Sequence, residues 1–78
     1  MTAQTPVVDV AAKTVTFEGK TYVMRPLSED SYTVLTAGVP VGRVVFSFGA
    51  ANAAVESSDI TEEALTAIGE AWFAAIDG

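Results

Sequence analysis

The C-terminal part of the chain carries the pattern that most constrains the fold, an amphipathic helix from about Glu62 to Ile76. Thr61 stands where an N-cap is needed, and two glutamates follow in the first turn, where the helix dipole favours negative charge. Ile60 and Leu65 match a hydrophobic staple around this cap. Apolar side chains at three- and four-residue steps predict one packing stripe, with Phe73 at its edge: Leu65, Ile68, Trp72 and Ile76. Gly69 lies within the stripe, and we expect it to let the helix approach a sheet closely.

Two segments nearer the N-terminus predict a β-hairpin. Residues 13–17 and 20–24 are rich in β-branched and aromatic residues, and Glu18-Gly19 lies between them. A two-residue hairpin loop needs positive φ angles, which Gly19 adopts without strain. In this register Val15 opposes Tyr22. One face of the hairpin is therefore expected to be buried, and it holds Val15, Phe17, Tyr22 and Met24.

A second hairpin is expected from Tyr32–Thr36 and Val41–Phe48, joined through residues 37–40. Residues 26–30 are expected to end the first ladder, because proline cannot donate a hydrogen bond and acidic residues favour turns. The alternation in the second strand of this hairpin indicates a central strand. Val44, Phe46 and Phe48 alternate there with Val45 and Ser47, and we expect this strand to carry the largest side chains of the sheet.

The stretch from Gly49 to Val55 is ambiguous. Its run of alanines suits a helix, and it equally suits a turn that leads into a short strand ending near Glu56. We favour the strand, because so few residues rarely form an independent helix.

These elements predict an α+β fold: a small antiparallel sheet of four or five strands, built as a meander of hairpins, with one C-terminal helix packed on one face. A chain of 78 residues has room for one domain, which we place at residues 13–78. Residues 1–12 are expected to form a flexible N-terminal tail, with a short strand at Val7–Val10 as a further expectation.

The residue types argue against catalysis. The chain has no histidine and no cysteine, so it lacks the commonest general base, the commonest metal ligand and any thiolate. Its serines are not set in a nucleophile-elbow pattern. Gly19-Lys20-Thr21 resembles only the end of a phosphate-binding loop, since Thr14 stands where that loop needs a glycine. We therefore expect no enzymatic activity, no cofactor and no metal site.

Charge is unevenly placed along the chain. Residues 1–43 hold all four basic residues and four acidic ones, so their charges sum to 4 − 4 = 0, and residues 44–78 carry the whole net charge of −6. Such a surface repels nucleic acid and anionic membranes and favours a basic protein as partner. The candidate partner-binding residues are Glu56, Asp59, Glu62, Glu63, Glu70 and Asp77.

The acidic helix face has two interpretations. Glu63, Glu70 and Asp77 are seven residues apart, so they line one side of the helix about 10 Å from each other. This side either keeps the protein soluble or docks on a basic groove. The docking hypothesis gains weight because the helix has no Lys or Arg and so forgoes stabilising i,i+4 ion pairs.

The function expected from this pattern is a non-enzymatic interaction protein. Size, acidity and the lack of catalytic residues suit an inhibitor that occupies a nucleic-acid-binding groove, as anti-CRISPR and anti-restriction proteins do. The alternative is an accessory or structural subunit that docks through a sheet edge or the helix, as a monomer or a homodimer. We expect a cytoplasmic location, because the first twelve residues carry no Lys or Arg and Asp9 interrupts their apolar run.

Overall fold

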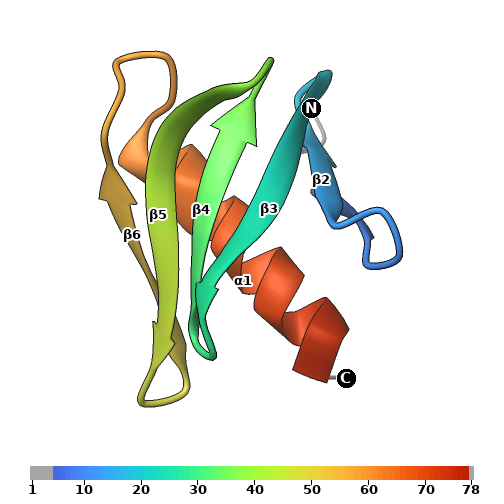
Figure 1. The fold of residues 1–78 in the computed structure, drawn as a ribbon, viewed down its shortest axis with the longest axis vertical. Coiled ribbons are helices and arrows are strands. Elements are labelled where there is room, and N and C mark those ends of the chain that lie inside the picture. Colours follow the sequence, from blue (N-terminus) through green and yellow to red (C-terminus); the bar gives the residue numbers. More distant parts are fainter. Residues whose placement is uncertain (1–4, 78) are drawn as a thin grey trace.

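The computed structural model describes residues 5–77 and confirms the α+β fold, with six strands instead of four or five. The elements are β1 (Val7–Asp9), β2 (Thr14–Phe17), β3 (Lys20–Ser28), β4 (Ser31–Thr36), β5 (Val39–Ser47), β6 (Ala50–Val55) and α1 (Glu62–Asp77). The strands form one antiparallel meander in chain order, and the sheet curls into a half-barrel. Helix α1 crosses the concave face and leaves the other face uncovered (Figure 1).

The first hairpin has the predicted register. Val15 pairs with Tyr22, and the turn at Glu18 and Gly19 has φ angles of 52° and 78°. Strand β1 precedes this hairpin and pairs with β2. It comes from the segment expected to be a tail with a short strand at Val7–Val10, whereas residues 1–4 lie outside the described part of the chain.

Strand β3 runs through Pro26, so the prediction that the ladder ends there was wrong. The backbone N–H of Met24 donates to the Lys13 carbonyl on the β2 side, at 2.8 Å. Alternate residues of a strand point the same way, so the nitrogen of Pro26 faces this side as well. Strand β2 pairs with β3 only as far as Val23. The N–H that proline lacks is therefore not needed, and the chain turns only at residues 29–30.

The loop of the second hairpin is shorter than predicted. Ala37 and Gly38, with φ angles of 53° and 80°, complete the turn, and β5 begins at Val39. Pro40 lies in the strand at a register shift, where Val34 pairs with Gly42 while Leu35 pairs with Pro40. A proline fits at such a bulge because the regular hydrogen-bond ladder is interrupted there.

Strand β5 lies between β4 and β6, as expected of a central strand, and β6 confirms the strand interpretation of the alanine-rich stretch. The predicted strand ended at Phe48, whereas β5 ends at Ser47, so Phe48 lies outside the strand. The chain reverses at Phe48 and Gly49, whose φ angles are 54° and 77°, and the Phe48 side chain is fully exposed at 106%. The strand alternation therefore stops one residue before Phe48.

The core lies between the concave face of the sheet and α1. Leu65, Ile68 and Trp72 are buried, as the helix stripe predicts, but Ile76 is 39% exposed and Phe73 is buried instead. Phe73 belongs to an aromatic cluster, because its ring lies 5.6 Å from that of Tyr32 and 5.0 Å from that of Phe46. The remaining buried hydrophobic residues are Val15, Tyr22, Met24, Val34, Val41, Val44 and Ile60.

Candidate interaction surface

Helix α1 presents acidic side chains on the side turned away from the sheet. Glu63 and Glu70 are exposed on this side, Glu62 is exposed in the first turn of the helix, and Leu65 and Trp72 are buried against the strands. Glu63 and Glu70 lie two turns apart, about 10 Å along the helix axis. The predicted acidic face is thus present at these residues. Asp77 ends the helix, but its side chain lies outside the described part of the structure.

Two other predicted residues have partners within the chain. Glu56 follows the end of β6, and its carboxylate lies 2.8 Å from Nε of Arg43 in β5. The charge of Glu56 is therefore paired. The Asp59 carboxylate accepts a hydrogen bond from the Ser57 hydroxyl, whose oxygen accepts one from the Asp59 backbone N–H. Asp59 thereby shapes the loop that leads into α1. Glu56 is thus paired with a base, whereas Asp59 is exposed in the loop that precedes the helix.

The structure adds acidic residues from the N-terminal half of the chain. Glu18, at the tip of the first hairpin, lines a pocket of about 340 Å³ together with Glu63. The apolar wall of this pocket comes from Phe17 and from two alanines of the helix, Ala64 and Ala67. Sequence reasoning counted Glu18 as balanced by nearby basic residues and did not place it beside the helix.

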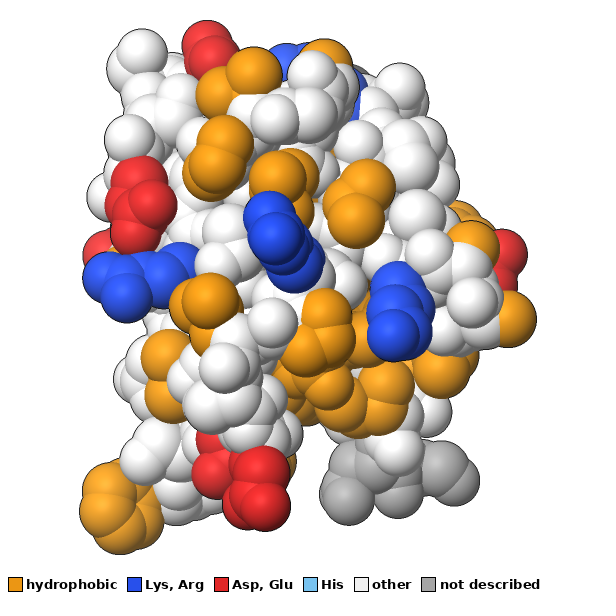
Figure 2. Space-filling model, in the orientation of Figure 1, with side chains coloured by type: hydrophobic (Ala, Val, Ile, Leu, Met, Phe, Trp, Pro, Cys, Tyr) orange, Lys and Arg blue, Asp and Glu red, His pale blue; other side chains and the backbone are white. Residues whose placement is uncertain are grey.

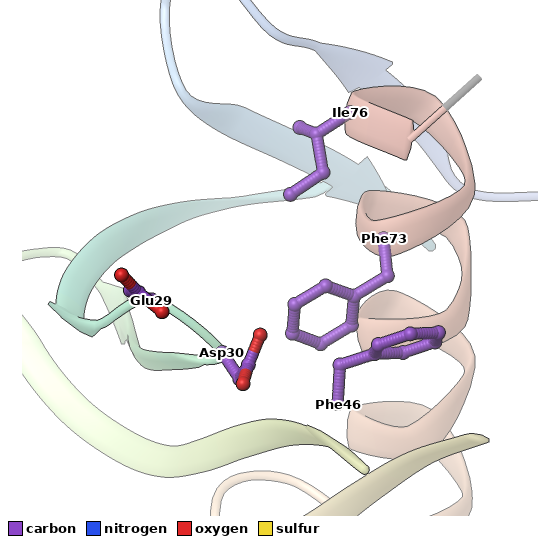
Figure 3. A pocket seen from close by; sticks show the side chains of 5 residues that line it. All are labelled: Glu29, Asp30, Phe46, Phe73 and Ile76. Atoms are coloured by element: carbon purple, nitrogen blue, oxygen red, sulfur yellow. The ribbon is translucent and has the colours of Figure 1, made fainter. Parts of the chain in front are cut away.

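A second addition lies at the opposite end of the sheet. Glu29 and Asp30, in the β3–β4 turn, line a pocket of about 220 Å³ with Phe46, Phe73 and Ile76. Figure 3 shows the two acidic side chains on the turn, across the pocket from the helix residues Phe73 and Ile76. The sequence identified the turn, but only the curl of the sheet decides that it faces the C-terminal half of α1.

A neighbouring pocket of about 280 Å³ brings Glu70 into this region. Phe46 and Phe73 line this pocket and also the pocket beside Glu29 and Asp30. This one aromatic pair therefore lies between the β3–β4 turn and Glu70. We call the exposed acids around α1 the acidic surface. Its members are Glu18, Glu29, Asp30, Glu62, Glu63 and Glu70.

Arginine occupies the other side of the sheet. Arg25 and Arg43 both pair with Thr33, so they stand in one row across β3, β4 and β5. Their chain neighbours Met24 and Val44 are buried, so the arginines point to the uncovered face, because successive side chains of a strand alternate. On this face basic side chains lie among hydrophobic ones (Figure 2). Two of the four basic residues of the chain thus lie on the face of the sheet opposite to α1.

One titratable group near the acidic surface has a shifted pKa. Burial raises the pKa of the Tyr22 hydroxyl above its ordinary value of 10.0, and the negative charge of Glu18 raises it further. The phenol is therefore uncharged at neutral pH and packs as a core residue. Within residues 5–77 no group of three or more acidic side chains is placed to hold a metal ion.

The arrangement thus offers negative charge beside shallow apolar pockets, a combination suited to contact with a basic macromolecule. Over the same described residues, no helix combines the length and the apolar character needed to cross a membrane. No family model, curated protein or solved structure matches the chain.

Proposed function

We propose that this protein is a non-catalytic interaction protein that docks its acidic surface on a basic surface of a partner protein. The observation that carries the proposal is the exposure of Glu63 and Glu70 on a helix without a single Lys or Arg. Glu18 extends this charge at one end of the helix, and the turn at residues 29–30 extends it near the other. Acids from three chain segments therefore add to one field.

The pockets support a basic partner in a second way. A Lys or Arg side chain has an apolar stem and a charged head, and the two parts prefer different surroundings. The aromatic pair Phe46 and Phe73 offers contact to the stem, while Glu29, Asp30 and Glu70 stand near enough to attract the head. Closely spaced basic side chains are typical of grooves that hold nucleic acid.

We therefore propose an inhibitor of the anti-CRISPR or anti-restriction type, acting in the cytoplasm by occupying such a groove. The small size and net charge of −6 support this role. Glu63 and Glu70, about 10 Å apart, are spaced more widely than successive charges of a nucleic-acid strand, which follow at about 3.4 Å along the helix axis. The protein would thus compete through its summed charge and not by copying the phosphate spacing.

Charge-matched variants test this proposal. Glu63→Gln with Glu70→Gln changes the net charge from −6 to −6 + 2 = −4 on the acidic surface. Thr16→Lys with Val45→Lys also brings the net charge of the protein to −4. In this variant the two changes lie on the uncovered face of the sheet, where both residues are exposed. Each variant and the wild type are immobilised, and proteins retained from host lysate are identified by mass spectrometry at 20 and 200 mM NaCl.

The expected result is a nucleic-acid-binding protein that the wild type and the Thr16/Val45 variant retain at low salt. The Glu63/Glu70 variant should retain much less of this partner protein. Added DNA or RNA should displace the partner from the wild type. Higher salt should weaken the capture, because it shortens the screening length of exposed charges. Equal retention by all three proteins, independent of salt, would exclude docking through the acidic surface.

The accessory-subunit alternative has a different observation in its favour. Residues 44–47 of the apolar strand predicted to be central lie inside the sheet in β5, so they offer no free edge. The long outer edge is instead that of β6, which carries neither charge nor proline. An accessory role through this edge predicts that capture is lost on Ala53→Pro and survives Glu63→Gln with Glu70→Gln.

A further inference from the structure

The outer edge of β6 has backbone groups that no strand within residues 5–77 pairs. The Glu56 N–H donates to the Val41 carbonyl of β5 at 2.9 Å. Because backbone groups alternate along a strand, the even-numbered residues of β6 face β5 and the odd-numbered ones face outward. Ala51, Ala53 and Val55 therefore direct their N–H and C=O groups to the open side.

Helix α1 packs against β6, but the strand itself lacks the length, sequence and backbone features with which monomeric proteins commonly protect an edge. Protected edge strands are commonly short, charged, interrupted by proline or twisted by a bulge. Strand β6 has six residues without charge or proline, and its pairing with β5 continues without a register shift. The opposite edge is that of β1, which has three residues and carries Asp9. Only the β6 edge is thus open over a longer stretch of the described sheet.

Five of the six residues of β6 form a sequence that is the same in both directions around Asn52. Residues 50–54 are Ala-Ala-Asn-Ala-Ala, so an antiparallel copy centred on Asn52 places alanine opposite alanine and asparagine opposite asparagine. In this register Ala51 and Ala53 of one copy exchange backbone hydrogen bonds with Ala53 and Ala51 of the other. The outward groups identified above are the ones that this pairing uses.

Two exposed side chains also fit this register. Phe48 is fully exposed beside the strand, and Val55 at the other end of the strand is 39% exposed. Antiparallel pairing about Asn52 places Gly49 opposite Val55 of the second copy, so Phe48 lies next to that valine. The Asn52 amide, which has only a 3.5 Å contact to the Ala50 carbonyl, faces its symmetry mate and can exchange hydrogen bonds with it.

We propose that β6 is a self-association site at which two copies of this chain pair antiparallel about Asn52 and join their sheets into one. A two-fold contact of this kind is self-complementary and closes after two copies. The inference stands apart from the proposed function, because it involves the sheet edge and not the acidic surface. Pairing through a single strand edge buries little area, so the association is weak. The fraction of dimer therefore rises with protein concentration.

Cysteine variants test the register directly, because the natural chain has no cysteine. Across the proposed axis the two Asn52 Cα atoms lie about 4.5 Å apart, within the range of a disulfide. Ala54 is exposed on the same face of the same strand, but its Cα lies about 14 Å from its mate. Mild oxidation should therefore convert most Asn52→Cys protein to a disulfide-linked dimer, while Ala54→Cys, the matched control, should form no such link.

Light scattering on the wild type should give a mass that rises from 8.1 kDa toward 2 × 8.1 = 16.2 kDa with concentration. Ala53→Pro removes an outward N–H without breaking the β5 ladder, and Asn52→Asp places two negative charges on the axis. Both variants should remain at the monomer mass with a wild-type circular dichroism spectrum. A wild type that stays at 8.1 kDa up to millimolar concentration, or equal crosslinking of the two cysteine variants, would overturn the proposal.

Discussion

Gly69 of α1 lies so close to Val44 of β5 that a Cβ atom on the glycine would stand 2.9 Å from Cγ1 of the valine. Val44 is fully buried and β-branched, so its side chain has little freedom to move aside. Gly42 of β5 meets Leu65 in the same manner, since a Cβ there would lie 2.5 Å from Cδ2 of the leucine. One glycine on each element therefore sets the distance between helix and sheet.

We predict that Gly69→Ala destabilises the protein. Alanine gains about 1 kcal/mol of helix propensity over glycine, whereas overpacking a filled core costs about 1–3 kcal/mol. A net loss of about 1 kcal/mol is expected, measured by urea unfolding followed through Trp72 fluorescence. Ala74→Gly on the exposed side of α1 serves as the propensity control and should lose about 1 kcal/mol without any clash. A Gly69→Ala protein more stable than the wild type would contradict the close contact.

Phe48→Asn is expected to stabilise the monomer. The φ angle of 54° at Phe48 is costly for an aromatic residue, whereas asparagine is favoured at this position of a two-residue hairpin turn. No packing is lost, because the Phe48 ring is fully exposed. The free energy of unfolding should rise by about 0.5–1 kcal/mol, which thermal unfolding would register as a higher midpoint. A lower midpoint would indicate that the ring contributes to the monomer fold.

Thr61→Ala should weaken the start of α1. The Thr61 Oγ1 atom accepts a hydrogen bond from the Ala64 N–H at 3.1 Å, which is the N-cap contact expected from the sequence. Its loss costs about 1 kcal/mol and lowers the unfolding midpoint by about 4–8 °C. Thr61→Ser retains the hydroxyl and should remain close to the wild type, and equal losses in the two variants would rule out the capping role.

Stability is expected to fall at alkaline pH through Tyr22. Burial, with a smaller contribution from Glu18, raises the pKa of this tyrosine above 10.0 in the folded state. The folded protein thus holds the Tyr22 proton more tightly than the unfolded chain does. The stability that this difference contributes is complete below pH 10 and declines as the pH rises through the folded-state pKa. Unfolding in urea between pH 8 and 12 would measure the decline. Tyr22→Phe should reduce it, and an unchanged pH profile in that variant would contradict the assignment.

Local patterns predicted most elements because the information for them lies within a few residues. The Glu18-Gly19 turn fixed which residues of the first hairpin face each other, and the period of the apolar residues identified α1. Pro26 and Phe48 were misassigned for a non-local reason. Whether a proline breaks a ladder depends on where the neighbouring strand ends, and whether a residue continues a strand depends on where the chain reverses.

The sequence by itself determined the class of fold, the acidic face of the helix and the lack of histidine and cysteine chemistry. Only the tertiary structure decided which acids share a surface. Glu56 is paired with Arg43, while Glu29 and Asp30 reach the helix through the curl of the sheet. The physical reason is that charge adds up over distances in space, and strand pairing sets those distances between residues far apart in the chain.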